Sequence, residues 1–248
     1  MSPRVAVVTG AGSGIGLGVA RRLATDGHAV ALLDLDADHV QKAAAELSEQ
    51  GHVASAYEVD VADRAAIERA YASVRRDLGP VTIVVTSAGI EAFDPLGDIT
   101  PEKWDRVLAV NLTGTFTCVQ LAVPDMVDGG WGRIITISSS SAQSGAPNMA
   151  HYVASKGGVI GLTKAFAREL AGHGITANTI PPTIVDTPMA QKGAEGGNVP
   201  GIEILGKMVP LGRAGTPEDI AAACSYLCSE EGGYVTGQVI GVNGGMYI

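Results

Sequence analysis

The sequence predicts a single α/β domain in which a doubly wound, parallel sheet of about seven strands is covered by helices on both faces. Short, continuously apolar runs alternate with longer helical patterns along the whole chain of 248 residues. Such runs are typical of strands that are buried on both faces of a parallel sheet. A glycine-rich loop, Gly10 to Gly16, joins the first apolar run to the first helical pattern. Together these features indicate βα units in series, without an internal repeat or a linker.

The expected elements follow from apolar periodicity and from capping residues. Strands are expected at 4–9, 29–33, 53–59, 81–85, 131–138, 174–180 and 239–242. Helices are expected after the glycine loop up to Asp26, and then at 37–47, 64–78, 101–123, 152–171 and 217–227. Asp36, Asp63 and Thr216 are predicted N-caps, and Pro124 is predicted to end the long fourth helix. Residues 187–210, rich in glycine, are expected to form a substrate lid, with a disordered surface loop as the alternative.

Composition excludes several classes of function. A net charge of −9 and 4% aromatic residues argue against a nucleic-acid partner. The three cysteines, Cys118, Cys224 and Cys228, indicate a reducing compartment and no disulfides, and no residues show metal-ligand spacing. Arg4 leads directly into the first strand, which leaves no room for a signal peptide. No apolar run approaches the roughly 18–20 residues that cross a membrane, so we expect a soluble cytoplasmic protein.

The glycine-rich loop predicts a dinucleotide site. It has a strand before it and a helix after it, the context in which such loops bind a pyrophosphate. Glycine lets the phosphates approach the backbone, and the helix N-terminus supplies free N–H groups and the positive end of a dipole. A purely structural turn is the alternative.

Asp34, at the end of the second strand, favours NAD over NADP. Its carboxylate can accept hydrogen bonds from the ribose hydroxyls of adenosine. It would repel a 2′-phosphate by about 4 kcal/mol at ~4 Å with an effective dielectric of ~20, before solvent screening. Ser13 provides no compensating positive charge in the loop. The alternative is that Asp34 or Asp36 only caps the next helix.

Tyr152 and Lys156 lie one helical turn apart and would share a helix face. Ser139 follows the fifth predicted strand, within a run of four serines. A phenol, an ammonium and a hydroxyl brought together suggest chemistry on carbonyls and alcohols, although a Tyr and Lys at this spacing also occur on ordinary solvated helices. Asn111 lies in the middle of a long helical pattern, where asparagine has modest propensity.

Taken in order, these motifs resemble those of the short-chain dehydrogenase/reductase family, over essentially the whole chain. Thr9 to Gly16 is similar to the family's TGxxxGxG loop, and Tyr152 with Lys156 to its YxxxK motif. The resemblance implies that the catalytic residues are Asn111, Ser139, Tyr152 and Lys156. It implies cofactor contacts from Gly10, Ser13, Gly14, Ile15, Gly16, Asp34, Leu35, Asp60, Val61, Ser87, Ala88, Gly89, Tyr152, Lys156, Pro182, Val185 and Thr187.

Two positions depart from the family pattern. Thr86-Ser87 replaces a pair of asparagines, and a serine has fewer hydrogen-bonding groups than an amide. Pro182-Thr183 replaces a Pro-Gly step. A β-branched residue does not readily adopt positive φ, so either this turn is rearranged or the position does not need positive φ.

The resemblance implies hydride transfer with NAD, in which Tyr152 is the acid/base. A Lys156 ammonium at ~5 Å would stabilise the phenolate by ~3 kcal/mol and bring its pKa from ~10 toward ~8. Ser139 would donate to the substrate oxygen, and Asn111 would hold a water that connects Lys156 to solvent. The expected substrate residues are Ser139, Gly145, Met149, Tyr152 and Met189, with further wall candidates at Glu91, Phe93, Val185, Ile202, Ile204, Leu205 and Met208.

The predicted function is a NAD-dependent secondary-alcohol dehydrogenase or ketone reductase that acts on a small, fairly apolar molecule. A 3-oxoacyl-thioester (acyl carrier protein) reductase is the enzyme alternative, and it should show a basic patch and usually NADPH. A non-catalytic NAD-binding regulatory protein is the other alternative. The family is commonly homotetrameric, so a homotetramer is expected, and Gly157, Gly158 and Gly161 would allow a partner helix to approach closely.

Overall fold

A six-stranded parallel sheet forms the centre of the protein, in the order β3-β2-β1-β4-β5-β6. The computed structural model describes residues 4–248. The strands are β1 (Val5–Thr9), β2 (Ala29–Asp34), β3 (Ala54–Glu58), β4 (Val81–Thr86), β5 (Gly132–Ile137) and β6 (Ile175–Ile180). The predicted doubly wound sheet is therefore confirmed. Its strand order reverses between β1 and β4, and in such sheets the crevice at this point is where ligands bind.

The expected seventh strand, at 239–242, is reduced to one parallel bridge between Val239 and Thr179 of β6. The Ile240 N–H donates to the Thr179 carbonyl at 2.9 Å. Gly237, with φ of +71°, turns the chain just before the bridge, and Gly241 follows it. The segment thus runs beside β6 for too few residues to form a strand.

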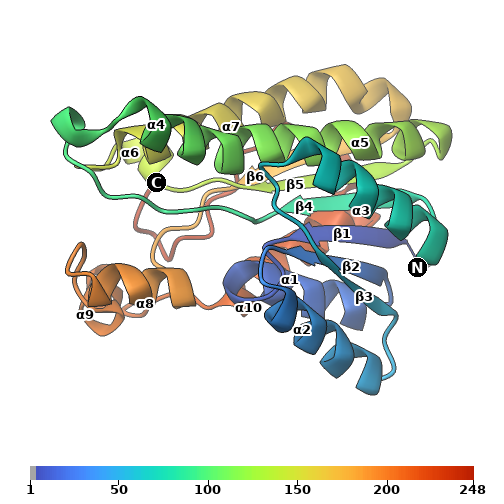
Figure 1. Ribbon diagram of the computed structural model, residues 1–248, viewed down its shortest axis with the longest axis horizontal. Coiled ribbons are helices and arrows are strands. Elements are labelled where there is room, and N and C mark those ends of the chain that lie inside the picture. The colour runs from blue at the N-terminus through green and yellow to red at the C-terminus, as the bar shows by residue number, and fades with distance from the viewer. Residues whose placement is uncertain (1–3) are drawn as a thin grey trace.

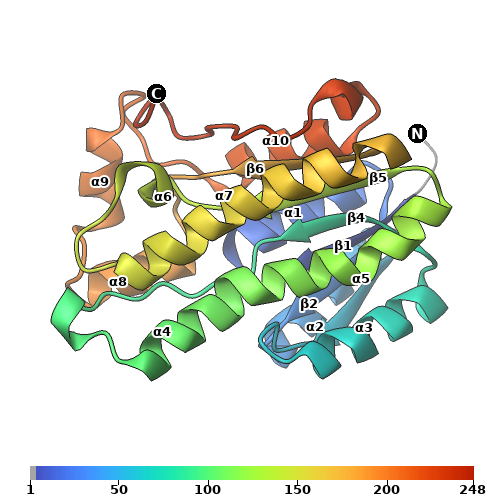
Figure 2. The ribbon, with the colours of Figure 1, turned by 90° about the horizontal axis from the view of Figure 1, so that it is seen from above.

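Helices cover both faces of the sheet (Figures 1 and 2). One face carries α1, α2 and α10, and the other carries α3, α5 and α7, while α8 and α9 lie together at one end. The helices are α1 (Gly14–Thr25), α2 (Ala37–Glu49), α3 (Arg64–Asp77), α4 (Pro101–Leu108), α5 (Gly114–Asp128), α6 (Ser141–Ser144), α7 (Ala150–Leu170), α8 (Pro188–Glu195), α9 (Ile202–Met208) and α10 (Pro217–Cys228).

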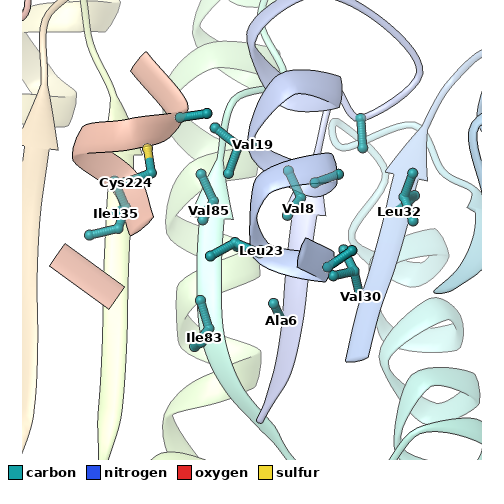
Figure 3. Close-up of a cluster of buried hydrophobic side chains, with 14 of the residues drawn as sticks. Ala6, Val8, Val19, Leu23, Val30, Leu32, Ile83, Val85, Ile135 and Cys224 are labelled. Atoms are coloured by element: carbon teal, nitrogen blue, oxygen red, sulfur yellow. The ribbon is translucent and has the colours of Figure 1, made fainter. Parts of the chain in front are cut away.

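Two apolar clusters hold the helices on the sheet, one on each face. Figure 3 shows the first, in which Val19 and Leu23 of α1 lie over Val8 and Val85 of the sheet. Cys224 of α10 lies beside Ile135 in the same cluster. All three cysteines are buried and form no disulfide, so they act as small core side chains.

The predicted N-caps are confirmed. The Asp36 carboxylate accepts from the His39 N–H at 3.0 Å, and Asp63 accepts from the Ala65 N–H at 2.9 Å. Thr216 and Asp219 form a reciprocal capping box at the start of α10.

The prediction that the long fourth helix ends at Pro124 is wrong, since α5 continues through Pro124 to Asp128. Arg75 of α3 stabilises this turn: its guanidinium donates to the Leu121 carbonyl at 2.6 Å and pairs with Asp125 at 2.9 Å. The backbone weakened by proline is therefore supported from a neighbouring helix.

The continuous helical segment Pro101–Asp128 is 28 residues long and contains an 18-residue stretch with a mean hydropathy of 1.4. By length and composition alone it is apolar enough to cross a membrane, so the sequence expectation that no run is long enough was too strict. Half of that stretch is buried in the structure. The α5 part of the segment is packed along β4 and against α3, as the core helix of a globular fold is.

Candidate active site

A cavity of about 520 Å³ opens at the carboxyl ends of the strands. Its wall includes every residue predicted to contact the cofactor, from Gly10 after β1 to Thr187 before α8. Three of the four predicted catalytic residues, Ser139, Tyr152 and Lys156, line the same space. The sheet therefore brings the two predicted halves of the site into one cavity.

The glycine loop is packed so closely on the start of α1 that Gly16 has no room for a side chain. A Cβ placed on Gly16 would lie 2.1 Å from the Gly10 carbonyl oxygen, so the loop folds back on the start of α1. Gly14, the first residue of α1, has φ of +52°, a conformation that favours glycine. The resulting cradle, at a helix N-terminus with free N–H groups, fits the pyrophosphate of a dinucleotide.

Asp34 belongs to this cradle. Its carboxylate accepts from the Gly12 N–H at 2.8 Å and from the Asp36 N–H at 3.0 Å. Asp36, not Asp34, caps α2. The alternative interpretation of Asp34 as a helix cap is thus wrong, and its carboxylate lies over the glycine loop on the cavity wall.

Two polar side chains position the neighbouring loops. The Thr9 hydroxyl accepts from the N–H groups of Ser87 at 3.2 Å and Ala88 at 3.1 Å, which holds the loop after β4 against β1. Asp60 accepts from the Ala62 N–H at 2.9 Å and pairs with Arg106 of α4 at 3.3 Å. The wall beneath the predicted adenine and ribose is therefore fixed by the protein itself.

Tyr152 and Lys156 lie on the first turns of α7 and face the cavity together with Ser139. The Lys156 Nζ is 5.8 Å from the centre of the Tyr152 ring and donates to the Ile137 carbonyl at 2.9 Å. Lys156 is only 5% exposed. The Ser139 hydroxyl lies 2.8 Å from that of Ser141, while the neighbouring Ser138 hydroxyl donates to the Lys156 carbonyl and is buried.

The expected pKa of ~8 for Tyr152 is wrong for the protein alone. Burial, followed by the nearby charge of Glu91, raises the pKa of Tyr152 to about 12, and interaction with Ser139 lowers it only in part. Burial also lowers the pKa of Lys156 to about 8. Coulomb's law between the two charges omits this removal from water, which opposes the charged form of both groups.

Asn111 does not line the cavity. It sits fully buried in a turn of π-helix, Ala109–Thr113, between α4 and α5. Its amide donates to the Ile90 carbonyl and to the Ser155 hydroxyl, both at 3.1 Å, and accepts from the Ile90 N–H at 2.9 Å. The side chain thus ties the loop after β4 to α7, and its predicted water-holding role stays a prediction.

Part of the predicted substrate wall lines the cavity. Met189 of α8 lines the cavity, together with Ser139 and Tyr152, but Gly145 and Met149 do not. The short helix α6 carries the chain away from the cavity after Ser139, and Gly145, with φ of +75°, ends it. Met149 is buried at the start of α7 instead.

Several other wall residues were named from the sequence, and several were missed. Glu91, Val185, Ile202 and Leu205 line the cavity, whereas Phe93, Ile204 and Met208 do not. The missed residues include Ile90, Arg106, Ile184 and Val199. Ile90 and Ile184 adjoin predicted residues in sequence and could have been found in that way. Arg106 comes from α4, and no motif pointed to it.

Thr183 does not need positive φ. Among residues 4–248, Asn148 is the one non-glycine residue with a positive φ. The Pro182 carbonyl accepts from the Ser140 N–H at 2.9 Å, which joins this turn to the serine run. The departure from a Pro-Gly step is therefore accommodated without backbone strain.

Comparisons with known proteins agree with this geometry. A family model described as Enoyl-(Acyl carrier protein) reductase matches residues 10–247. A (3R)-3-hydroxyacyl-CoA dehydrogenase of Mus musculus is 42% identical, over 98% of this chain and 96% of its own length. A D-threitol dehydrogenase of Mycolicibacterium smegmatis is 36% identical, over 99% of this chain and 93% of its own.

Among solved structures, a variant of actinorhodin polyketide ketoreductase with NADPH superposes with a TM-score of 0.94. It is 36% identical, and the match covers 98% of this chain and 97% of that one. Fold, cofactor cradle and whole-chain relatives point the same way: the protein belongs to the short-chain dehydrogenase/reductase family of oxidoreductases, which bind a nicotinamide cofactor.

Proposed function

We propose that the protein is a NAD-dependent oxidoreductase that interconverts a secondary alcohol and a ketone. The observation that carries this proposal is the shared cavity, in which Ser139, Tyr152 and Lys156 face the cradle formed by the glycine loop and Asp34. The cradle leaves space for a dinucleotide, and the three polar side chains provide the groups that proton transfer requires.

Each catalytic side chain has a role in this proposal. The glycine loop and Asp34 would hold a nicotinamide dinucleotide, which would supply hydride transfer to and from the carbinol carbon. Tyr152 donates a proton to the substrate oxygen when the ketone is reduced and accepts it when the alcohol is oxidised. Ser139 donates a hydrogen bond to that oxygen and orients it. Lys156 is anchored on the Ile137 carbonyl at 2.9 Å and supplies positive charge beside the phenol.

Asp34 supports NAD over NADP as the cofactor. Both of its oxygens already accept backbone N–H groups, which fixes the carboxylate where it would meet the adenosine ribose. A 2′-phosphate would be placed against this negative charge. The structural relative solved with NADPH makes cofactor choice the first property to measure.

A 3-oxoacyl-thioester reductase is the second candidate function. The family description and the hydroxyacyl-CoA dehydrogenase relative favour it. The D-threitol dehydrogenase relative favours a small alcohol instead. Turnover of thioester substrates with NADPH would distinguish the thioester reductase from the alcohol dehydrogenase. The absence of turnover with either substrate class would favour a non-catalytic, NAD-binding regulatory protein.

The assembly, the lid and the location are part of the same proposal. We place the protein in the cytoplasm as a homotetramer, and we regard residues 187–210, with helices α8 and α9, as its substrate lid. Within residues 4–248, nothing lies within 4 Å of a Cβ built on Gly157 or Gly161 of α7, so this helix face is open to a partner copy. Gly158, in contrast, packs on Leu112 of the same chain.

A substrate screen tests the function. Purified protein is incubated with secondary alcohols and NAD or NADP, and with ketones and the reduced cofactors, while cofactor absorbance is followed. We expect turnover of at least one alcohol–ketone pair, with a higher kcat/KM for NAD. Turnover confined to 3-oxoacyl thioesters with NADPH would contradict the proposal.

A further inference from the structure

Glu91 places a carboxylate in the substrate half of the cavity. It follows the loop after β4 and lines the same wall as Tyr152 and Met189. It faces α8, since a Cβ built on Gly193 would lie 3.4 Å from the Glu91 Oε2. The same Gly193 position is 3.5 Å from Val199, so the carboxylate lies among mostly apolar lid residues.

The structure provides no partner for this carboxylate. Within residues 4–248, no hydrogen bond or ion pair reaches Glu91, and burial alone raises its pKa. The neighbouring acid Asp94 differs, since it pairs with Lys103 and with the buried His151. Glu91 is half-buried on the cavity wall, so a substrate that displaces solvent from its carboxylate must supply a hydrogen-bond donor in exchange.

The position of Glu91 restricts which donor it would meet. Its charge is close enough to Tyr152 to raise the pKa of the phenol. Both side chains line the same cavity of about 520 Å³, so a small substrate can reach Glu91 while its carbinol meets Tyr152. An anionic group would be repelled there. A cationic group would be attracted by Glu91 but repelled by the Lys156 ammonium and by the positive charge of an oxidised nicotinamide. A neutral hydroxyl donates to the carboxylate and meets neither repulsion.

We propose that Glu91 is a specificity-determining residue, which accepts a hydrogen bond from a second hydroxyl of the substrate. The preferred substrates are then diols and hydroxy ketones rather than simple alcohols and ketones. This inference rests on the proposed function, because it concerns the same cavity and the same reaction.

Matched alcohols test the inference. The kcat/KM of NAD reduction is measured with 2-butanol, 2,3-butanediol and 1,3-butanediol, for wild type, Glu91→Gln and Glu91→Leu. Glu91→Ala replaces the leucine variant if that variant does not fold. Glu102→Gln, which alters an exposed acid at the start of α4, is the matched control.

The informative quantity is the ratio of kcat/KM for each diol to that for 2-butanol. This ratio cancels any general effect of Glu91 on the Tyr152 phenol, which acts on every substrate. We expect wild type and Glu102→Gln to prefer at least one diol by tenfold or more. We expect Glu91→Leu to lose that preference, chiefly through a higher KM for the diol, and Glu91→Gln to retain part of it because its amide oxygen still accepts.

The outcomes separate the two proposals. The inference is overturned, and the proposed function left intact, if wild type has equal kcat/KM for 2-butanol and for both diols. An unchanged ratio in Glu91→Leu, or in Glu91→Ala where it replaces the leucine variant, has the same consequence. No turnover of any alcohol with either cofactor overturns the proposed function, and the inference with it.

Discussion

The two halves of the cavity are built in different ways. The cofactor half, from the glycine loop to Gly89, is shaped by close backbone packing. A Cβ built on Gly16 would lie 2.1 Å from the Gly10 oxygen, and the Thr9 hydroxyl accepts from the backbone N–H groups of Ser87 and Ala88. The substrate half is shaped by side chains from segments far apart in sequence, such as Glu91, Met189 and Leu205. Close backbone packing tolerates little change, so substitutions in the cofactor half should weaken cofactor binding and stability. Side chains can be replaced, so substitutions in the substrate half should change substrate preference.

The largest expected effect lies where the halves meet. Tyr152→Phe removes the proton carrier and should lower kcat by about 10²–10⁴-fold, the usual contribution of general acid–base catalysis. The Kd for NAD, measured by calorimetry, should change little because the ring remains. A variant with near wild-type turnover would contradict the assignment of Tyr152.

In the cofactor half, Gly16→Ala should abolish measurable NAD binding and lower the free energy of unfolding by about 1–3 kcal/mol, the usual cost of overpacking. The added methyl would lie 2.1 Å from the Gly10 oxygen, so the loop must open. Gly172→Ala is the control, since nothing described lies within 4 Å of a Cβ there. Calorimetry with NAD and urea unfolding measure the two effects; equal NAD affinity in both variants would refute the role of the loop.

Lys156, between the halves, should make stability depend on pH. Burial lowers its pKa to about 8 from 10.5, so the unfolded chain binds more protons between these values. Wild type should therefore gain stability relative to Lys156→Met as the pH rises from about 7 to about 10, by up to about 3 kcal/mol.

Urea unfolding at the two pH values measures this difference. Lys164→Met, which removes an exposed ammonium from the same helix, controls for the loss of a charge. A gap between wild type and Lys156→Met that does not change with pH would show that Lys156 is not buried as a charged group.

The smallest expected effect concerns cofactor choice. Asp34→Asn removes the negative charge and keeps an oxygen for the Gly12 N–H, so kcat/KM with NADP should rise about tenfold relative to NAD, or about 1.4 kcal/mol. Asp38→Asn, an exposed acid on α2, should leave the ratio unchanged. Steady-state rates with both cofactors give the ratio of kcat/KM for NADP to that for NAD. If this ratio is unchanged in Asp34→Asn, Asp34 does not select NAD.

The same contrast explains what could be predicted from sequence. Six of the seven predicted strands and the caps at Asp36, Asp63 and Thr216 depend on local patterns, and they were predicted correctly. The residues predicted to contact the cofactor line one cavity because parallel strands end at one edge of the sheet. Gly145 and Met149 lie outside the cavity wall because the helix α6, which no pattern indicated, follows Ser139, and their predicted contact with substrate stays a prediction. Two predictions were wrong because they depend on contacts between distant segments. The segment 239–242 meets β6 in one bridge instead of forming a strand, and the helix continues past Pro124 beside Arg75 of α3.

Electrostatics was the least predictable part of the site. The distance between Tyr152 and Lys156 was close to expectation, at 5.8 Å from ring centre to Nζ, yet the pKa of the phenol moved the other way. Burial dominates both groups, and burial is a property of the assembled cavity. Glu91 adds to the effect on Tyr152 from a loop that carries no motif of its own.

Transfer of a deuterium label tests the central claim most directly. A secondary alcohol that is turned over in the screen is prepared with deuterium on its carbinol carbon, incubated with the protein and NAD, and the reduced cofactor is analysed by mass spectrometry. We predict that wild type transfers the label to NADH, and that Tyr152→Phe does so at a rate lower by about 10²–10⁴-fold. Unlabelled NADH from wild type, or label transfer by Tyr152→Phe at the wild-type rate, would contradict the account.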